Sequence, residues 1–263
     1  MADTLVQRAT AEVLQAIDAT EFLESSYGFR PGRPQHQALD ALTVAIAHGK
    51  VSWVLDADLR AFFETIDHAW LLRMLEQRIA DTRVLRHIKK WLAAGVLEDG
   101  VVHVNAQGSP QGGSISPLLA NIYLHYAFDL WAECWRRQHA RGEVSIVRFA
   151  DDVVVCFQYR EDAERFPARM QERLAHCHLE LHGEKTRVLE FGRYAVQHRQ
   201  DRGLGKPETF TFLGCTHSCG HHRHGGFIVL RKSARKQVTA KVKAIARTLR
   251  RRITDPVEVI GQW

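Results

Sequence analysis

The stretch RFADDVVV (residues 148–155) sets two adjacent aspartates, Asp151 and Asp152, inside a run of apolar and β-branched residues. Such a run predicts a buried strand. Burying an ionised carboxylate costs several kcal/mol unless a positive charge offsets it. The pair therefore either meets a lysine, an arginine or a metal ion, or lies in an exposed hairpin turn, where Asp is a favoured residue. Both interpretations are open on this stretch alone.

A second candidate strand, VSWVLDADL (51–59), carries two more carboxylates. Alternate residues of a strand share a face, so Asp56 and Asp58 point the same way. Neighbouring strands lie about 4.8 Å apart. If this strand lies beside the 144–158 hairpin, one of its carboxylates comes within a few ångströms of Asp151. Successive residues of a strand point to opposite faces, so we expect Asp151 to be a direct metal ligand and Asp152 to be peripheral.

Oxygen donors of this kind indicate both the metal and the chemistry. Three carboxylates without His or Cys favour Mg²⁺ or Mn²⁺ over zinc. Such ions bind protein carboxylates and substrate phosphates together, and two of them about 4 Å apart contact the attacking and leaving oxygens of a phosphoryl transfer. The sequence therefore predicts a site for two ions, Mg²⁺ or Mn²⁺.

The spacing of apolar residues predicts an α+β fold. Strands are expected over 51–59, 144–149, 152–158, 179–181 and 187–191, a short extended pair over 97–105, and helices over 5–24, 36–48, 68–78, 82–95, 118–137 and 160–177. Counted from Val51, the order β-α-β-β-α-β is that of the ferredoxin-like, split βαβ arrangement, a sheet with two helices on one face. A hairpin is expected beyond this unit, followed by a basic amphipathic helix over residues 233–253.

The 263 residues carry a formal net charge of +6, but the charges are unevenly distributed. Residues 209–254 contain eleven Lys and Arg and no Asp or Glu, and the other residues carry the remaining 25 basic and all 30 acidic side chains. A mildly acidic body with a basic tail indicates an anionic partner, with nucleic acid first among the candidates. A solvated helix with a charged face is the alternative.

The five scattered cysteines and the lack of an export signal indicate a reduced, cytoplasmic protein. No apolar run approaches the roughly 18 residues that span a bilayer. Six potential zinc ligands lie within ten residues: Cys215, His217, Cys219, His221, His222 and His224. Their alternating spacing is not that of a four-ligand zinc turn. We therefore expect adventitious metal binding there rather than a structural site.

Six blocks of sequence follow one another between residues 27 and 214: YGFRPGRPQHQAL, LDADLRAFFETIDH, GSPQGGSISPLLANIYL, RFADD, LHGEKTRVLEFG and FTFLG. In order and rough spacing they resemble the reverse transcriptases encoded by group II introns. The resemblance implies a right-hand polymerase with fingers and a ferredoxin-like palm, RNA-directed DNA synthesis, and often a maturase role in splicing the parent intron. The partners it implies are an RNA template, a DNA primer, deoxynucleoside triphosphates and group II intron RNA.

The resemblance also implies roles for the residues around the carboxylates. In the pattern D-[IL]-[KR]-x-[FY]-F, Asp58 matches the metal ligand, which completes a catalytic set with Asp151 and Asp152. Leu59 would offer its backbone carbonyl to the same ions. Arg60 falls where a basic residue contacts the triphosphate.

Further positions are implied for the nucleotide and the nucleic acid. Phe63 matches an aromatic ring that walls off the ribose 2′-hydroxyl, and either Phe63 or Phe62 is expected in the core. Gln111 matches the block that lines the nucleotide pocket, Lys185 the lysine that approaches the departing pyrophosphate, and FTFLG (210–214) the hairpin that grips the primer end. Nucleic-acid contacts are expected from Arg30, Arg33, Arg231, Lys232, Arg235 and Lys236.

The resemblance divides the chain into partial fingers (1–50), a palm with an inserted finger segment (51–207), a primer-grip-like hairpin (208–232) and a basic helix (233–263) that leads toward a thumb the sequence lacks. Without a thumb, weak binding of primer–template is expected. Two other functions fit these residues. One is a non-catalytic, RNA-binding maturase fragment, against which the intact aspartates count. The other is a defence-associated reverse transcriptase, which shares the palm.

Overall fold

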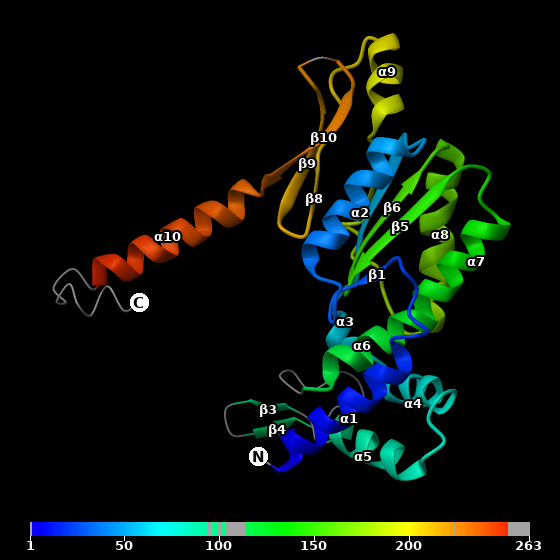
Figure 1. Cartoon of the computed structure of the whole chain (residues 1–263), viewed down its shortest axis with the longest axis vertical. Helices are drawn as coiled ribbons and strands as arrows, with labels where there is room; N and C mark the ends of the chain where they lie inside the picture. Colours follow the sequence, from blue (N-terminus) through cyan, green and yellow to red (C-terminus); the bar gives the residue numbers. More distant parts are fainter. Residues whose placement is uncertain (1, 94–95, 99–100, 104–113, 224, 252–263) are drawn as a thin grey trace.

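The computed structural model describes residues 2–93, 96–98, 101–103, 114–223 and 225–251 (Figure 1). Its central sheet has the strand order β1-β5-β6-β2-β7. The strands are β1 (Ser26–Tyr27), β2 (Trp53–Asp58), β5 (Val144–Phe149), β6 (Asp152–Phe157) and β7 (Arg187–Glu190). Numbered 1 to 4 in sequence order, the strands β2, β5, β6 and β7 lie side by side in the order 4-1-3-2, read from β7 to β5. This order confirms the ferredoxin-like palm.

The sheet begins earlier in the chain than the sequence predicted. Strand β1 pairs in parallel with β5, in the register Ser26↔Arg148 and Tyr27↔Phe149. Residues 26–27 thus form an edge of the central sheet, although they lie before residue 50, and the division into fingers and palm stays a prediction. The strand expected over 179–181 is wrong, because this segment forms only an isolated bridge, Leu59↔Leu181.

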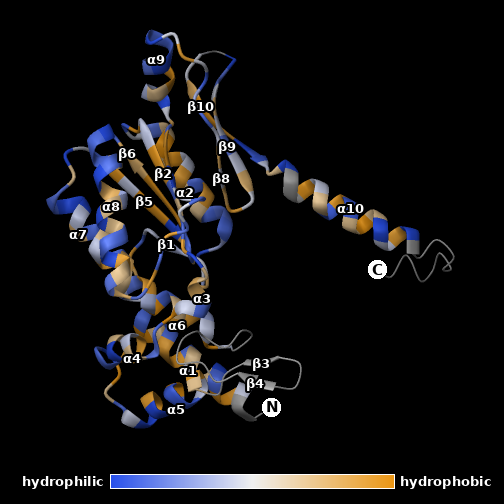
Figure 2. Ribbon diagram, turned by 180° about the vertical axis from the view of Figure 1, so that it is seen from behind, coloured by the Kyte–Doolittle hydropathy of each residue, from blue (hydrophilic) through white to orange (hydrophobic). Residues whose placement is uncertain are grey.

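Alternation along the central strands produces two cores, one on each face of the sheet. Leu55 and Val155 belong to one apolar cluster, and Val54 and Val154 belong to the other. Because both faces are covered, these strands are apolar almost throughout. Figure 2 shows the hydrophobic colouring concentrated on β2, β5 and β6.

Helices cover the two faces unequally. One face packs against α8 (Arg160–His176) and shares an apolar cluster with a long helix made of α6 (Ser116–Leu124), the π-helical segment η1 (His125–Asp129) and α7 (Leu130–Gln138). The other face packs against α2 (Gln35–His48). The sequence predicted one uninterrupted helix over 118–137; π segments are rare and occur often near functional sites.

Six further elements gather at one end of the sheet, below it in Figure 1. They are α1 (Ala2–Asp18), α3 (Phe62–Thr65), α4 (His68–Glu76), α5 (Thr82–Ala93), β3 (Val96–Glu98) and β4 (Val101–His103). Helix α4 begins where the Asp67 carboxylate accepts a hydrogen bond from the Trp70 N–H (2.8 Å), an ordinary N-cap. The predicted helices 68–78 and 82–95 and the extended pair 97–105 are confirmed to within a few residues.

The C-terminal elements form a second sheet and a projecting helix. They are α9 (Arg193–Asp201), β8 (Phe210–Phe212), β9 (Cys215–His221), β10 (Phe227–Ser233) and α10 (Arg235–Arg251). The predicted hairpin is thus a three-stranded sheet, β10-β9-β8, and α9 was not predicted. Figure 1 shows α10 extending away from the body of the protein. Among the described residues, no helix combines the length and apolar character needed to cross a membrane.

Candidate active site

The turn between β5 and β6 brings the aspartates together. Phe149 pairs with Asp152 across the hairpin, which leaves Ala150 and Asp151 as its two turn residues. Ala150 has φ 53°, in the left-handed region that non-glycine residues rarely adopt. The tight turn predicted at this place is confirmed.

Strand β2 delivers the third carboxylate to the same turn. Asp58 lies directly opposite Asp152 in the antiparallel register of β2 and β6, and directly opposed residues point to the same face of a sheet. Asp56 lies two residues farther from the turn, opposite Arg187 on β7. The register therefore favours Asp58 over Asp56 as the partner of the Asp151–Asp152 pair, in agreement with the resemblance.

These carboxylates lie close enough together to disturb one another's protonation. Burial raises the pKa of Asp152 to about 6, and the neighbouring charges of Asp151, Asp58 and Asp56 add to the effect. Burial also raises the pKa of Asp151, as does the charge of Asp58. Within the described part of the chain, neither Asp151 nor Asp152 forms an ion pair. The cluster is therefore incompletely neutralised by the protein.

Lys185 supplies the nearest positive charge. The His182 N–H donates to the Asp58 carbonyl (2.8 Å), and the Thr186 N–H donates to the His182 carbonyl (2.8 Å). This turn sets Lys185 beside Asp58, where Nζ forms an ion pair with Oδ2. The pairing raises the pKa of the lysine. Lys185 thus lies at the aspartates, as the sequence predicted; its role toward pyrophosphate stays a prediction.

Asp56 is a further carboxylate of this group. Burial raises its pKa to about 6 even though Arg187 lies opposite and lowers it, and Asp58 raises it again. Arg187 Nε lies 3.8 Å from Asp56 Oδ2. A group of partly buried carboxylates with raised pKa values is common at functional sites.

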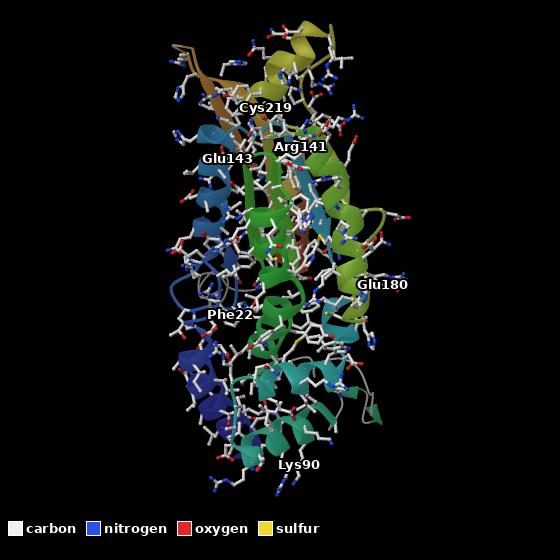
Figure 3. The ribbon with its side chains drawn as sticks, turned by 90° about the vertical axis from the view of Figure 1, so that its right-hand side faces the viewer. Phe22, Lys90, Arg141, Glu143, Glu180 and Cys219 are labelled. Carbon is white, nitrogen blue, oxygen red and sulfur yellow. The ribbon has the colours of Figure 1, made fainter. Side chains whose placement is uncertain are left out.

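Leu59 and Arg60 continue β2 beyond the aspartate. The Leu59 side chain is buried. The bridge between Leu59 and Leu181 is formed by two backbone hydrogen bonds, one to the Asp58 carbonyl and one from the Arg60 N–H. The Leu59 carbonyl takes no part in either bond. Arg60 Nη1 lies 3.6 Å from Glu180 Oε2, and both side chains are exposed. Glu180 is labelled in Figure 3 just beyond the end of α8. The assigned metal and triphosphate contacts of Leu59 and Arg60 stay predictions.

Two adjacent phenylalanines have different environments. Phe62 is buried in the core, which confirms that one of the two is a core residue. Phe63 is only partly buried and meets the ring of Phe62 (centroids 5.4 Å apart) and that of Phe29 (6.3 Å), both edge-on. Phe29, which the sequence analysis did not single out, is half-exposed with φ 50°. Gln111 lies outside the described residues.

The arginines assigned to nucleic acid make contacts within the protein. Arg30 Nη1 donates to the carbonyls of Leu23 (2.8 Å) and Ser26 (2.6 Å). Arg33 Nη1 donates to the Glu24 carbonyl (3.2 Å). Both therefore brace the loop that leads into β1, and their assignment to nucleic acid stays a prediction.

The basic residues of the second sheet and α10 are more accessible. Arg231 Nη1 lies 2.7 Å from Asp40 Oδ1 on α2, and Lys232 and Arg235 are exposed. The side chain of Lys236 lies outside the described residues. The nucleic-acid role of these four residues stays a prediction.

The cysteines and histidines of β9 alternate along an ordinary strand. His217 is fully buried and stacks on Phe210 (centroids 4.8 Å apart), and burial lowers its pKa to about 4. Burial raises the pKa of the Cys219 thiol to about 11. His224 lies outside the described residues. Of the residues that the structure describes, no three His, Cys, Asp or Glu side chains are arranged to hold a metal ion, here or at the aspartate turn.

Sequence reasoning missed Arg148, the residue that begins the RFADD block. Its guanidinium is fully buried and forms a two-point ion pair with Asp129. An arginine inside an otherwise apolar strand was a signal that could have been used, since buried charges are paired. Its partner could not have been found, because Asp129 lies in a helix with no pattern linking it to β5.

Comparisons with known proteins place this site in a family. Residues 1–217 match the family described as reverse transcriptase (RNA-dependent DNA polymerase). The chain is 41% identical over 123 residues to the group II intron-encoded protein LtrA of Lactococcus lactis, which is 47% of this chain and 20% of LtrA. It is 33% identical over 163 residues to protein YkfC of Escherichia coli, 56% of this chain and 42% of YkfC.

A fungal relative and two solved structures extend the comparison. The chain is 31% identical over 198 residues to an uncharacterized 91 kDa protein in a cob intron of Schizosaccharomyces pombe, 73% of this chain and 24% of that protein. A truncated apo telomerase from Candida tropicalis shares the fold with TM-score 0.56 and 13% identity, over 88% of this chain and 45% of the telomerase. A Candida albicans telomerase gives TM-score 0.53 and 13% identity, over 82% and 36%.

The chain spans less than half the length of these relatives. Reverse transcriptases generally use divalent metal ions, and the family match covers β2, β6 and the turn that together carry the aspartates. The chain belongs to the reverse transcriptase (RNA-dependent DNA polymerase) family.

Proposed function

We propose that this chain is an RNA-directed DNA polymerase of the group II intron type, which extends a DNA primer by two-metal nucleotidyl transfer with Mg²⁺ or Mn²⁺. One observation carries the proposal. Asp58 on β2, opposite Asp152 on β6, meets the Asp151 turn, and burial together with mutual repulsion raises the pKa of the hairpin carboxylates. Lys185 offsets only part of this negative charge, so a further cation would stabilise the cluster.

The donor set fits hard divalent ions. Asp58, Asp151 and Asp152 offer only oxygen atoms, which suits Mg²⁺ and Mn²⁺ and not zinc. Divalent ions bound there would offset the charge of substrate phosphates and lower the pKa of the primer 3′-hydroxyl.

The residues around the aspartates would bind and orient the nucleotide. Lys185 and Arg60 place two positive charges at the end of β2, where they would stabilise negative charge that develops on the triphosphate. Phe63, on the short helix that follows, would restrict the ribose 2′-hydroxyl. The partial burial of Phe63, beside the half-exposed ring of Phe29, supports this assignment.

The expected partners are an RNA template and a DNA primer. The excess of basic residues over 209–254 supports binding to a polyanion, and relatives named as intron-encoded proteins support group II intron RNA as one ligand. All five cysteines are free, which supports a reducing, cytoplasmic setting.

Primer extension on poly(rA)/oligo(dT) with Mg²⁺ or Mn²⁺ tests the proposal. We expect the wild type to extend the primer and Asp151→Asn to lose on the order of 10³-fold in rate. RNA affinity should stay nearly unchanged, because it depends on basic residues elsewhere. Two inactive proteins that both bind RNA tightly would overturn the proposal and favour a non-catalytic maturase fragment.

A further inference from the structure

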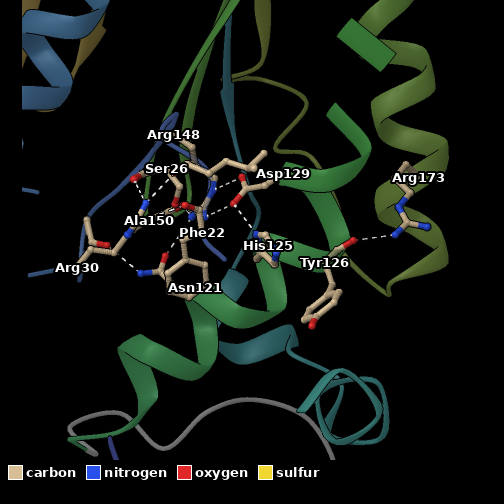
Figure 4. Close-up of polar contacts among 12 residues, drawn as sticks. Phe22, Ser26, Arg30, Asn121, His125, Tyr126, Asp129, Arg148, Ala150 and Arg173 are labelled. Atoms are coloured by element: carbon tan, nitrogen blue, oxygen red, sulfur yellow. Dashed lines mark hydrogen bonds and ion pairs between the residues drawn. The ribbon is translucent and has the colours of Figure 1, made fainter. Parts of the chain in front are cut away.

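The side of β5 that faces α8 and η1 carries a polar network that contains none of the aspartates proposed as catalytic. Arg148 Nε donates to Asp129 Oδ1 (2.7 Å), and Nη2 donates to Asp129 Oδ2 (2.6 Å) and to the Ser26 hydroxyl (2.6 Å). Nη1 donates to Asn121 Oδ1 (3.1 Å). Arg148, Asp129, Asn121 and Ser26 are all buried. Figure 4 shows the guanidinium surrounded by these partners.

The network reaches the catalytic turn through one more bond. Arg148 Nη1 also donates to the carbonyl of Ala150 (2.9 Å), the turn residue with φ 53° that directly precedes Asp151. A left-handed non-glycine residue is strained by about 1–2 kcal/mol and persists only where its surroundings hold it. The Arg148 bond is one of the contacts that hold it.

Strand β1 and the loop that follows it hold the same turn from the other side. The Ala150 N–H donates to the Tyr27 carbonyl (3.2 Å), and Asn121 Nδ2 donates to the Gly28 carbonyl (2.8 Å). Gly28 lies so close that an added Cβ would stand 2.9 Å from the Ala150 nitrogen. Asn121 therefore links Arg148 to the loop that contacts the turn.

The π segment η1 contributes the acid of the ion pair. It holds both Asp129 and His125, whose Nδ1 lies 3.9 Å from Asp129 Oδ2, and burial lowers the pKa of that histidine. Extra residues in a π turn change the direction of the side chains that follow. Arg173 lies on the other side of the same segment, where it donates to the carbonyls of Tyr126 (2.8 Å) and Ala127 (3.0 Å).

We propose that Arg148 is a positioning residue for the catalytic turn: held by Asp129, Asn121 and Ser26, its guanidinium fixes the Ala150 carbonyl and thereby the placement of Asp151. This inference rests on the proposed polymerase function. It adds a buried residue that touches neither substrate nor metal but determines the geometry of a metal ligand. Displacements of about 1 Å in such a site cost on the order of 10²-fold in rate.

Arginine is required for this arrangement because it offers five donors in one rigid plane. Lysine keeps the charge beside Asp129, but its single ammonium cannot also reach Ser26, Asn121 and the Ala150 carbonyl. Arg148→Lys therefore separates charge compensation from positioning. Arg173→Lys is the matched control, because it makes the same chemical change at another arginine that contacts η1 but does not contact the turn.

The experiment compares both variants with the wild type in three measurements: urea unfolding, hydrogen exchange of the peptide that covers residues 147–153, and primer-extension kinetics. For Arg148→Lys we expect at least tenfold faster exchange at the turn and an about 100-fold lower kcat, with KM for the nucleotide changed less than about threefold. Arg173→Lys should lose some stability and keep wild-type kcat and turn exchange.

Wild-type kcat in a folded Arg148→Lys variant, or an equal loss of kcat in Arg173→Lys, would overturn the inference. If Arg148→Lys does not fold, Asn121→Ala keeps the ion pair and removes the link to Gly28. Asn121→Ala should lower kcat about tenfold, and a wild-type kcat in this variant would contradict the inference. If the wild type itself does not extend primers, the proposed function fails, while the exchange data still test whether Arg148 holds the turn.

Discussion

Two aspartates near the same hairpin show opposite treatments of charge. Asp129, on the side of the sheet that faces α8, is buried and accepts two hydrogen bonds from Arg148. Asp152, on the side that faces α2, forms no ion pair with any described residue, and burial and neighbouring carboxylates raise its pKa to about 6. Asp129 is thus neutralised within the protein, whereas Asp152 at the candidate site has no ion-pair partner among the described residues.

The two arrangements also differ in what their removal should cost. Breaking a buried ion pair leaves one charge unpaired in a low-dielectric interior, which costs about 3–5 kcal/mol. Removing one carboxylate from a crowd of like charges relieves repulsion and costs little or nothing. Substitutions in the Arg148–Asp129 pair should therefore reduce stability, whereas substitutions of the candidate-site aspartates should reduce activity with little loss of stability.

The largest effect is expected for Asp129→Asn, which leaves the fully buried Arg148 without its counter-charge. We expect it to lower the free energy of unfolding by about 3–5 kcal/mol in urea titrations. Asp81→Asn is the control, because Asp81 pairs with an exposed Arg83 and the loss of an exposed ion pair changes stability little. If Asp129→Asn and Asp81→Asn lower the free energy of unfolding equally, the buried ion pair does not stabilise the fold in the way stated.

An intermediate effect is expected for Gly28→Ala. The added Cβ would lie 2.9 Å from the Ala150 nitrogen and 3.1 Å from the Phe149 ring, at φ 78°. We expect a loss of about 2 kcal/mol in stability together with a loss of primer extension, because the catalytic turn must shift.

Gly32→Ala separates backbone strain from the close contact. Gly32 has a similar φ of 70°, but nothing lies within 4 Å of the added Cβ. It should cost about 1 kcal/mol and leave primer extension unchanged. A loss of activity in Gly32→Ala equal to that in Gly28→Ala would show that the contact with the turn is irrelevant.

The smallest effect is a pH dependence of the metal-free protein. Asp152 has a pKa of about 6, above its ordinary 3.8, so between these values the folded state binds more protons than the unfolded state. Its contribution to stability therefore becomes more favourable as the pH falls through about 6. In EDTA, Asp152→Asn should be more stable than the wild type at pH 7.5, and this advantage should shrink at pH 5. An advantage that grows on acidification would contradict the charge crowding.

Much of the palm could be predicted from the sequence because its signals are local. The mostly apolar run predicted β5, with the expected and observed bounds both 144–149, and the Asp pair marked the turn. Asp58 could be separated from Asp56 only through the resemblance, and the register of β2 and β6 then agreed with it. Lys185 was also assigned by resemblance, and a local turn places it beside Asp58.

What could not be predicted depends on contacts between distant segments. Strand β1 has only two residues, and its pairing with β5 joins positions 26 and 148. The partners of Arg148 come from residues 26, 121 and 129, which share no periodic pattern. The π segment is likewise invisible in a helical pattern whose apolar residues continue through it.

Binding of Mn²⁺, followed by electron paramagnetic resonance, tests the central claim most directly. The wild type, Asp58→Asn and the exposed control Asp81→Asn would be titrated at pH 7.5 with a dideoxy-terminated oligo(dT) primer on poly(rA) and dTTP. The account predicts that the wild type and Asp81→Asn bind Mn²⁺ with the same affinity and that Asp58→Asn binds it at least tenfold more weakly. Unchanged Mn²⁺ affinity in a folded Asp58→Asn variant would contradict it, because the carboxylate cluster would then not be the metal site.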